Sequence, residues 1–233
     1  MKIAIYTLTR DRLAYTKHCF QRLYCLAGYA FDHFVLDNGS TDGTAEWLQT
    51  ELPGKNSRGL FEVTCLPENV GISRGSNMML DKILGRGGYD LVIKMDNDCE
   101  VETPDLLKDV VKVFDLLNRV KKRMVLSPRV VGINRQPHRG GTIYVGGWKV
   151  GLTGIVGGLF HIVQADVYRE YRYPEVLPKA WGQDDDFCEW LRIKEIGKGY
   201  IEGLVVNHYE TTAGQAARFP EYFERKWKEE KFL

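Results

Sequence analysis

Apolar and polar positions follow two distinct periods over the first hundred residues. Four short apolar runs predict strands, at 3–8, 31–36, 60–66 and 89–95. Three intervening segments have apolar residues at helical spacing and predict helices, at 13–26, 45–52 and 71–84. Regular alternation of strand and helix is typical of a mostly parallel sheet with helices on both faces.

The second half is less regular. Thr103-Pro104-Asp105 combines a capping hydroxyl, a proline suited to a first helical turn and an acid near the positive helix end, which predicts a helix to about residue 118. Strands and β-like segments are expected at 124–131, 139–158, 159–163 and 200–206. Further helices are expected near 166, over 184–196 and in the amphipathic tail 219–232. No linker separates the halves, so we predict one α/β domain over 1–233, with a smaller mixed β region in its second half.

Polar clusters directly follow each of the first four predicted strands. They are Thr9-Arg10, the segment from Asp37 to Thr44, the segment from Glu68 to Asn77, and Asp96-Asn97-Asp98. In parallel sheets, ligands bind at the carboxyl ends of the strands. We therefore expect these clusters to meet along one edge of the sheet.

Asp96 and Asp98 end the apolar run Leu91–Met95. Residues two apart on an extended strand point to the same side, so both carboxylates can face one crevice. Two like charges this close repel unless a cation lies beside them, and Mg²⁺ and Mn²⁺ favour such oxygen ligands. Taken alone, Asp-x-Asp is a very common pattern, and a surface turn that ends a strand explains it better than a metal site does.

Composition narrows the function classes. The 32 basic and 31 acidic residues give a net charge of +1, so no basic excess favours nucleic-acid binding. Five widely spaced cysteines without a Cys-x-x-Cys pair indicate reduced thiols. The first apolar run is too short for a signal peptide, and the longest uncharged run, 150–165, is shorter than a membrane-spanning helix. We expect a cytoplasmic protein without a transmembrane segment, able to lie peripherally at the inner face of a membrane.

The order of the motifs resembles the family 2 glycosyltransferases, which have the GT-A (Rossmann-like) fold. The resemblance covers most of residues 3–210. It is carried by Thr7-Leu-Thr-Arg10, Asp37-Asn-Gly-Ser-Thr-Asp-Gly-Thr44, Asn69-Val-Gly71 with Asn77, Asp96-Asn-Asp98 (a DXD motif), Gly157-Gly158 and Trp181-Gly-Gln-Asp-Asp-Asp-Phe187. It implies transfer of a sugar from a nucleotide-diphosphate donor to an acceptor, usually with a divalent metal and with inversion.

The resemblance implies donor contacts in the first half, residues 1–100. Asp37 would contact the base or ribose, although a carboxylate there can also cap the following helix. Thr9 and Arg10 would flank the base. The remaining predicted donor contacts are Asn69 at the base edge, Gly71 at a tight turn, Arg74 near a phosphate, and Asn77.

The resemblance assigns Asp98 to Mn²⁺ or Mg²⁺ and places Asp96 nearer the ribose. His208, after the last predicted strand, is the expected second metal ligand, with Glu210 as an alternative. The general base would be Asp184, with Asp185 and Asp186 able to share the role. Gln183 departs from the family's usual glutamate. Three acids at a helix N-terminus also fit a purely structural role beside the helix dipole.

Residues 101–210 are expected to bind the acceptor, a glycan, lipid-linked or protein hydroxyl. Gly158 would let it approach the backbone, and Trp181 would stack on a sugar face. Residues 211–233 would form a loop over the diphosphate and a packed helix. Two alternatives stay open: a sugar-nucleotide nucleotidyltransferase, disfavoured because no glycine-rich loop follows the first strand, and a non-catalytic nucleotide- or glycan-binding protein.

Overall fold

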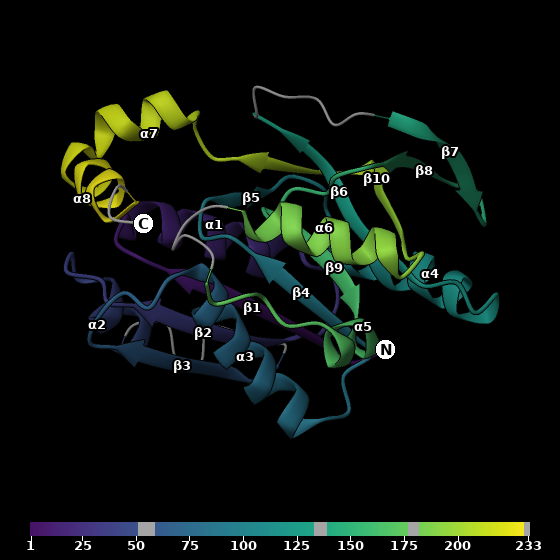
Figure 1. Ribbon diagram of the computed structural model, residues 1–233, viewed down its shortest axis with the longest axis horizontal. Helices are drawn as coiled ribbons and strands as arrows, with labels where there is room; N and C mark the ends of the chain where they lie inside the picture. The colour runs from purple at the N-terminus through teal and green to yellow at the C-terminus, as the bar shows by residue number, and fades with distance from the viewer. Residues whose placement is uncertain (51–58, 133–138, 177–181, 231–233) are drawn as a thin grey trace.

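A continuous twisted sheet runs through the whole molecule (Figure 1). The computed structural model describes residues 1–50, 59–132, 139–176 and 182–230. Within them the sheet has ten strands: β1 (Ile3–Thr9), β2 (Asp32–Asn38), β3 (Phe61–Leu66), β4 (Leu91–Met95), β5 (Cys99–Val101), β6 (Met124–Val131), β7 (Arg139–Val145), β8 (Trp148–Thr153), β9 (Phe160–Gln164) and β10 (Gly197–His208). The predicted α/β architecture is confirmed.

The strand order is β3-β2-β1-β4-β9-β6-β10-β8-β7, and β5 pairs with β10. The first four strands are parallel, so the chain leaves each of them at the same edge of the sheet. β9 is antiparallel to both β4 and β6, and the β7–β8 hairpin extends the sheet from β10. The predicted mixed β region is therefore an extension of the same sheet.

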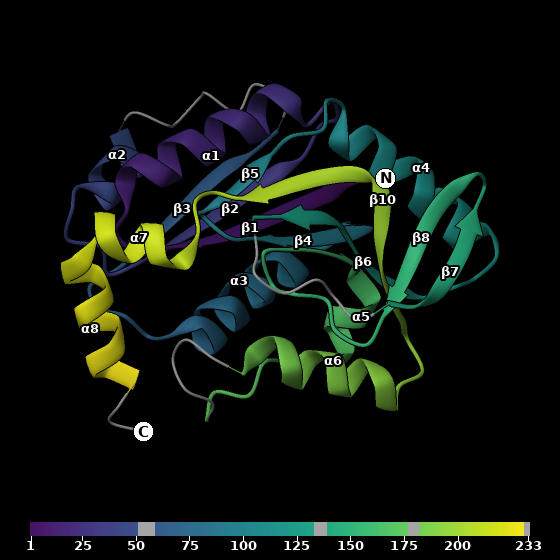
Figure 2. The ribbon, with the colours of Figure 1, turned by 90° about the horizontal axis from the view of Figure 1, so that it is seen from above.

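Helices cover both faces of the sheet (Figure 2). They are α1 (Leu13–Leu26), α2 (Thr44–Thr50), α3 (Ile72–Arg86), α4 (Leu106–Arg119), α5 (Ala165–Glu170), α6 (Gln183–Ile193), α7 (Thr212–Arg218) and α8 (Pro220–Glu230). α1 and α4 lie over one face, and α3, α5 and α6 lie over the other. None of the helices in the described part of the chain has the length and hydrophobicity needed to cross a bilayer.

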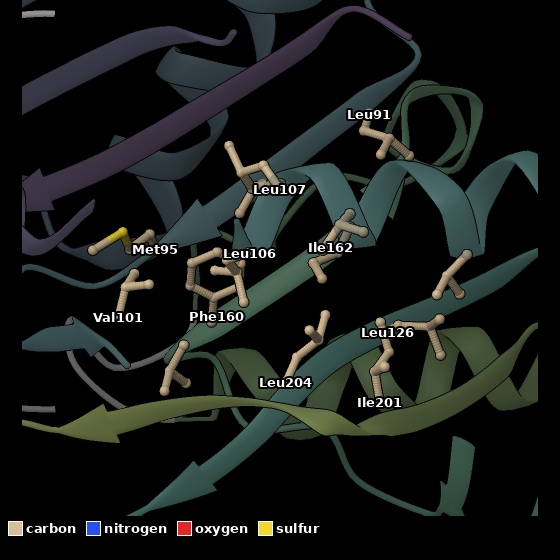
Figure 3. Close-up of a cluster of buried hydrophobic side chains, with 14 of the residues drawn as sticks. Leu91, Met95, Val101, Leu106, Leu107, Leu126, Phe160, Ile162, Ile201 and Leu204 are labelled. Atoms are coloured by element: carbon tan, nitrogen blue, oxygen red, sulfur yellow. The ribbon is translucent and has the colours of Figure 1, made fainter. Parts of the chain in front are cut away.

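The larger core lies between the sheet and helices α1 and α4. Figure 3 shows Leu106 and Leu107 of α4 close to Phe160 and Ile162 of β9. All six apolar residues of α4 that share the inner face are buried: Leu106, Leu107, Val110, Val113, Phe114 and Leu117. Full burial of one such side chain contributes roughly 1.5–3 kcal/mol, so packing of this stripe fixes α4 on the sheet.

The segment between Asp98 and α4 differs from the sequence prediction in two respects. The residues after Asp98 form the short strand β5, and α4 begins at Leu106 rather than after a Thr103 cap. The Oγ1 of Thr103 instead accepts a hydrogen bond from the backbone N–H of Val205 at 2.7 Å. This segment therefore bonds to β10, a long-range pairing that local capping preferences do not encode.

Candidate active site

A cleft with a volume of about 490 Å³ opens at the carboxyl ends of β1, β2 and β4. The predicted polar clusters converge there: Thr9 ends β1 and Arg10 follows it, Asn38 ends β2, Asn69 follows β3, and Asp96 to Asp98 follow β4. The opposite wall comes from the start of α6 and from Ile155 and Gly157. Residues from both halves of the sequence therefore share one cavity of the size typical of small-molecule sites.

Asp98 lies at the bottom of this cleft and is only 7% exposed. Its Oδ2 accepts hydrogen bonds from Arg12 Nη1 at 2.9 Å and from Gln215 Nε2 at 3.2 Å, and His208 Nε2 lies 3.7 Å away. Burial alone would raise the pKa of Asp98, but Arg12 and His208 outweigh burial and lower it to about 2. The carboxylate is therefore ionised at neutral pH.

His208 is oriented as a metal ligand would be. Its Nδ1 lies 2.7 Å from the carbonyl oxygen of Glu210, which can only accept a hydrogen bond. When the ring is neutral, its proton is therefore on Nδ1, and Nε2, on the side of Asp98, carries the lone pair that a metal ion would accept.

Two side chains alone do not complete a metal site. Among the described residues, no group of three or more His, Cys, Asp or Glu side chains surrounds one position. Two protein ligands suit Mg²⁺ or Mn²⁺ that is also bound by water and a substrate phosphate. Asp98 and His208 therefore fit such a cation, provided that the guanidinium of Arg12 moves away from Asp98 Oδ2 when the cation binds. The predicted alternative, Glu210, instead accepts a hydrogen bond from the hydroxyl of Tyr15 through its own carboxylate.

Asp96 projects from the end of β4, and its side chain is 43% exposed. The Nζ of Lys94, the buried lysine two residues earlier, lies 2.5 Å from Asp96 Oδ1 and 2.6 Å from the carbonyl oxygen of Gly158. Lys94 also lines the cleft. The two carboxylates of the DXD motif are thus paired with different cations, Asp96 with Lys94 and Asp98 with Arg12.

Asp184 and Asp185 line the cleft from the first turn of α6. The backbone N–H of Gly158 donates to Asp184 Oδ2 at 2.7 Å, which orients this carboxylate. Asp186, the third acid of the run, instead accepts a hydrogen bond from the hydroxyl of Tyr171 at 2.7 Å and does not line the cleft. The structure thus separates two candidate bases from one acid that holds α6 to its neighbours.

Asp37 lies beneath the cleft surface rather than on it, with 1% exposure. Its carboxylate accepts hydrogen bonds from Thr9 Oγ1 at 2.8 Å and from the backbone N–H and hydroxyl of Ser40 at 3.0 and 2.6 Å. The Ser40 contacts are the local turn bonding expected of an aspartate after a strand. Contact with a base or ribose stays a prediction for Asp37, whereas Thr9 lines the cleft itself.

The remaining predicted donor residues divide between the cleft and its surroundings. Asn69 lines the cleft, and its Oδ1 accepts from the N–H of Gly71 at 2.9 Å. Gly71 has φ 85°, a conformation suited to glycine, and precedes α3. Arg74 is exposed outside the cleft lining. Asn77 bonds both backbone groups of Tyr173, at 2.8 and 3.0 Å, so its amide fixes the chain after α5.

Gly158 does not line the cleft, although Gly157 does. An added Cβ at Gly158 would lie 2.3 Å from Asp184 Oδ1, so the space beside this glycine is filled by the candidate base. Trp181 lies outside the described residues. The acceptor contacts proposed for these two residues stay predictions.

The C-terminal segment contributes residues that the sequence did not indicate. A loop was expected over 211–218, but Thr212–Arg218 form α7. Gln215 within this helix is 2% exposed and bonded to both Arg12 and Asp98. α8 adds Tyr222, Phe223 and Lys226 to the cleft wall, and Tyr222 stacks over the Arg12 guanidinium at 4.8 Å. No local pattern distinguished Arg12 or Gln215 from solvated surface residues. Lys94 did carry a signal, because a lysine inside a buried strand requires a partner.

Solved structures share this fold at low sequence identity. A Pyrobaculum calidifontis mannosyltransferase, solved with GDP-Man and Mn²⁺, superposes with a TM-score of 0.69 at 14% identity over 92% of this chain and 59% of its own. S. aureus TarS residues 1–349, solved with UDP-GlcNAc, give a TM-score of 0.67 at 16% identity over 89% of this chain and 58% of theirs. GalNAc-T7, solved with UDP, GalNAc and Mn²⁺, gives a TM-score of 0.69 at 11% identity. The match covers 91% of this chain and 44% of the GalNAc-T7 chain.

These likenesses establish the fold, and the chain spans less than two thirds of each of the three proteins. No curated protein sequence matches this chain. The family model for glycosyl transferase family 2 matches residues 4–145, which is more than half of the sequence and includes the strands that carry Thr9, Asp37 and the DXD motif. The chain belongs to glycosyl transferase family 2.

Proposed function

We propose that the protein is a metal-dependent glycosyltransferase that moves a sugar from a UDP- or GDP-sugar to a hydroxyl acceptor. The observation that carries this proposal is the convergence of the DXD carboxylates of β4 and the acids of α6 on one cleft. Family membership supports the reaction class. The nucleotide sugars and Mn²⁺ named for the similar structures support the donor and the metal.

The donor would bind across the ends of β1 to β4. Thr9, Arg10, Asn69 and Asp96 all line the cleft. The first three would meet the nucleoside, and Asp96 would meet its ribose. Asp98 and His208 would hold Mn²⁺ or Mg²⁺, which when bound neutralises charge on the diphosphate. Arg12 is a second cation beside the same carboxylate, and it can contact the diphosphate when it leaves Asp98.

The transfer step is a displacement at the anomeric carbon of the donor sugar. The acceptor oxygen forms a bond to that carbon, the bond to the diphosphate oxygen breaks, and its electron pair leaves with the nucleotide diphosphate. Asp184 takes the hydroxyl proton as general base, with Asp185 adjacent on the same helical turn. Attack from the face opposite the leaving group would invert the configuration.

The acceptor would enter along the wall formed by Ile155 and Gly157. Its chemistry is a hydroxyl of a glycan, a lipid-linked sugar or a protein. We place the enzyme in the cytoplasm or peripherally at the inner face of a membrane, because all five of its cysteines are free thiols.

A panel of nucleotide sugars tests this function. Thermal unfolding with each donor, with and without Mn²⁺, identifies the donor by a Mn²⁺-dependent rise in Tm. The products then separate the reaction classes. Release of a nucleotide diphosphate supports transfer, release of pyrophosphate indicates a nucleotidyltransferase, and binding without turnover indicates a binding protein.

A further inference from the structure

Lys94 is a charged residue within the otherwise apolar strand β4, one position before its last residue. Its side chain is 7% exposed, and a buried ammonium is tolerated only when it is paired and hydrogen-bonded. Its ammonium contacts two different segments: the carboxylate of Asp96, directly after β4, and the carbonyl of Gly158 at 2.6 Å. Lys94 therefore bonds the DXD motif to the loop that precedes β9.

Gly158 extends this connection to the candidate base. Its carbonyl accepts from Lys94, and its N–H donates to Asp184 Oδ2 at 2.7 Å. The same loop is fixed to β4 by the bond from the N–H of Asp96 to the carbonyl of Leu159 at 3.0 Å. A continuous series of short contacts thus runs from Asp96 through Lys94 and Gly158 to Asp184.

Burial would lower the pKa of Lys94, but the carboxylates of Asp96 and Asp184 raise it above the ordinary lysine value. The ammonium therefore stays charged at neutral pH. A neutral side chain of the same length would fill the same space but donate to neither Asp96 nor Gly158.

We propose that Lys94 is a positioning residue that sets the distance between the donor-side carboxylate Asp96 and the base Asp184 by holding Gly158. This inference rests on the proposed function for its catalytic consequence, but the linkage itself does not. Transfer requires the donor carbon and the base to be aligned, and a displacement of about 1 Å can cost on the order of 100-fold in rate.

Hydrogen exchange of the Gly158 amide, followed by NMR, tests the linkage without any substrate. Lys94→Met is expected to accelerate exchange of this amide at least about tenfold, because Gly158 loses its own bond to β4 and only the neighbouring Leu159 bond remains. Lys94→Arg keeps a cation and restores most of the protection. Lys198→Met is the matched control. Lys198 is 8% exposed and donates to the carbonyl of Cys188 at 3.0 Å, outside the cleft lining. Unchanged Gly158 protection in Lys94→Met overturns the proposal. If Lys94→Met does not fold, Lys94→Leu, which also lacks a donor, supplies the same comparison.

Kinetics test the catalytic consequence. Lys94→Met is expected to lower kcat for nucleotide-diphosphate release about 100-fold, with partial recovery in Lys94→Arg. If Lys94 acts through Asp184, adding Lys94→Met to Asp184→Asn costs less than about threefold more. If the double variant instead has a kcat about a further 100-fold below that of Asp184→Asn, Lys94 does not act through Asp184 and the proposal is overturned. A wild-type protein that turns over no nucleotide sugar refutes the proposed function instead, and the exchange experiment still decides the linkage.

Discussion

Gly158→Ala tests whether the position of Asp184 governs turnover. The new Cβ would lie 2.3 Å from Oδ1, 2.8 Å from Oδ2 and 2.9 Å from Cγ of Asp184, whereas ordinary contacts begin near 3.4 Å. The carboxylate must therefore move by about 1 Å. Such a displacement is expected to lower kcat on the order of 100-fold. Overpacking of this kind also destabilises the fold by about 1–3 kcal/mol.

The assay measures nucleotide-diphosphate release for kcat and KM, and calorimetry measures donor affinity. Gly158 does not line the cleft, so donor affinity is expected to stay within about threefold of wild type. Gly154→Ala is the matched control, because it adds the same methyl group to the same loop with no atom within 4 Å. Gly158→Ala with wild-type kcat would refute the role given to the Asp184 position.

Two further predictions concern the other end of the cleft. Because Asp98 has a pKa lowered to about 2, its ionised form contributes stability that is fully present above pH 4 and is lost as the pH falls through 4 towards 2. The free energy of unfolding is measured by urea titration with EDTA at several pH values. In wild type it should fall by about 2 kcal/mol between about pH 5 and pH 2 because of Asp98, and Asp98→Asn should lack this part of the fall. The same pH profile in both proteins would contradict the lowered pKa of Asp98. His208→Gln should abolish the rise in Tm that Mn²⁺ and nucleotide diphosphate produce together. His18→Gln, whose ring instead pairs with Glu100, should retain that rise, and equal losses in both variants would exclude His208 as a specific ligand.

The elements whose patterns are local were predictable from the sequence. The strand at 124–131 was predicted with the bounds that β6 has, and the buried stripe of α4 follows directly from apolar spacing. β5 was missed because three residues are too few for a period and its pairing with β10 is made across the fold. The Thr103 cap was wrong for the same reason, because a long-range bond to β10 displaced a local one.

The candidate site shows a similar division. The motif order located Asp96, Asp98, Asp184 and His208, because each lies at or just after the end of a strand or in the first turn of a helix. It did not locate Arg12 or Gln215, which reach Asp98 only through tertiary packing of α1 against the C-terminal helices. Nothing in the spacing of residues 12, 98 and 215 along the chain encodes their contact.

The most direct measurement of the central claim compares wild type with Asp184→Asn in sugar transfer and in donor binding. With the donor identified by thermal shift, wild type is expected to release nucleotide diphosphate in a Mn²⁺-dependent, acceptor-stimulated reaction. Asp184→Asn should bind the donor within about threefold of wild type and lose transfer by on the order of 100- to 10,000-fold, the contribution typical of a general base. Wild-type-like transfer by Asp184→Asn would contradict the account.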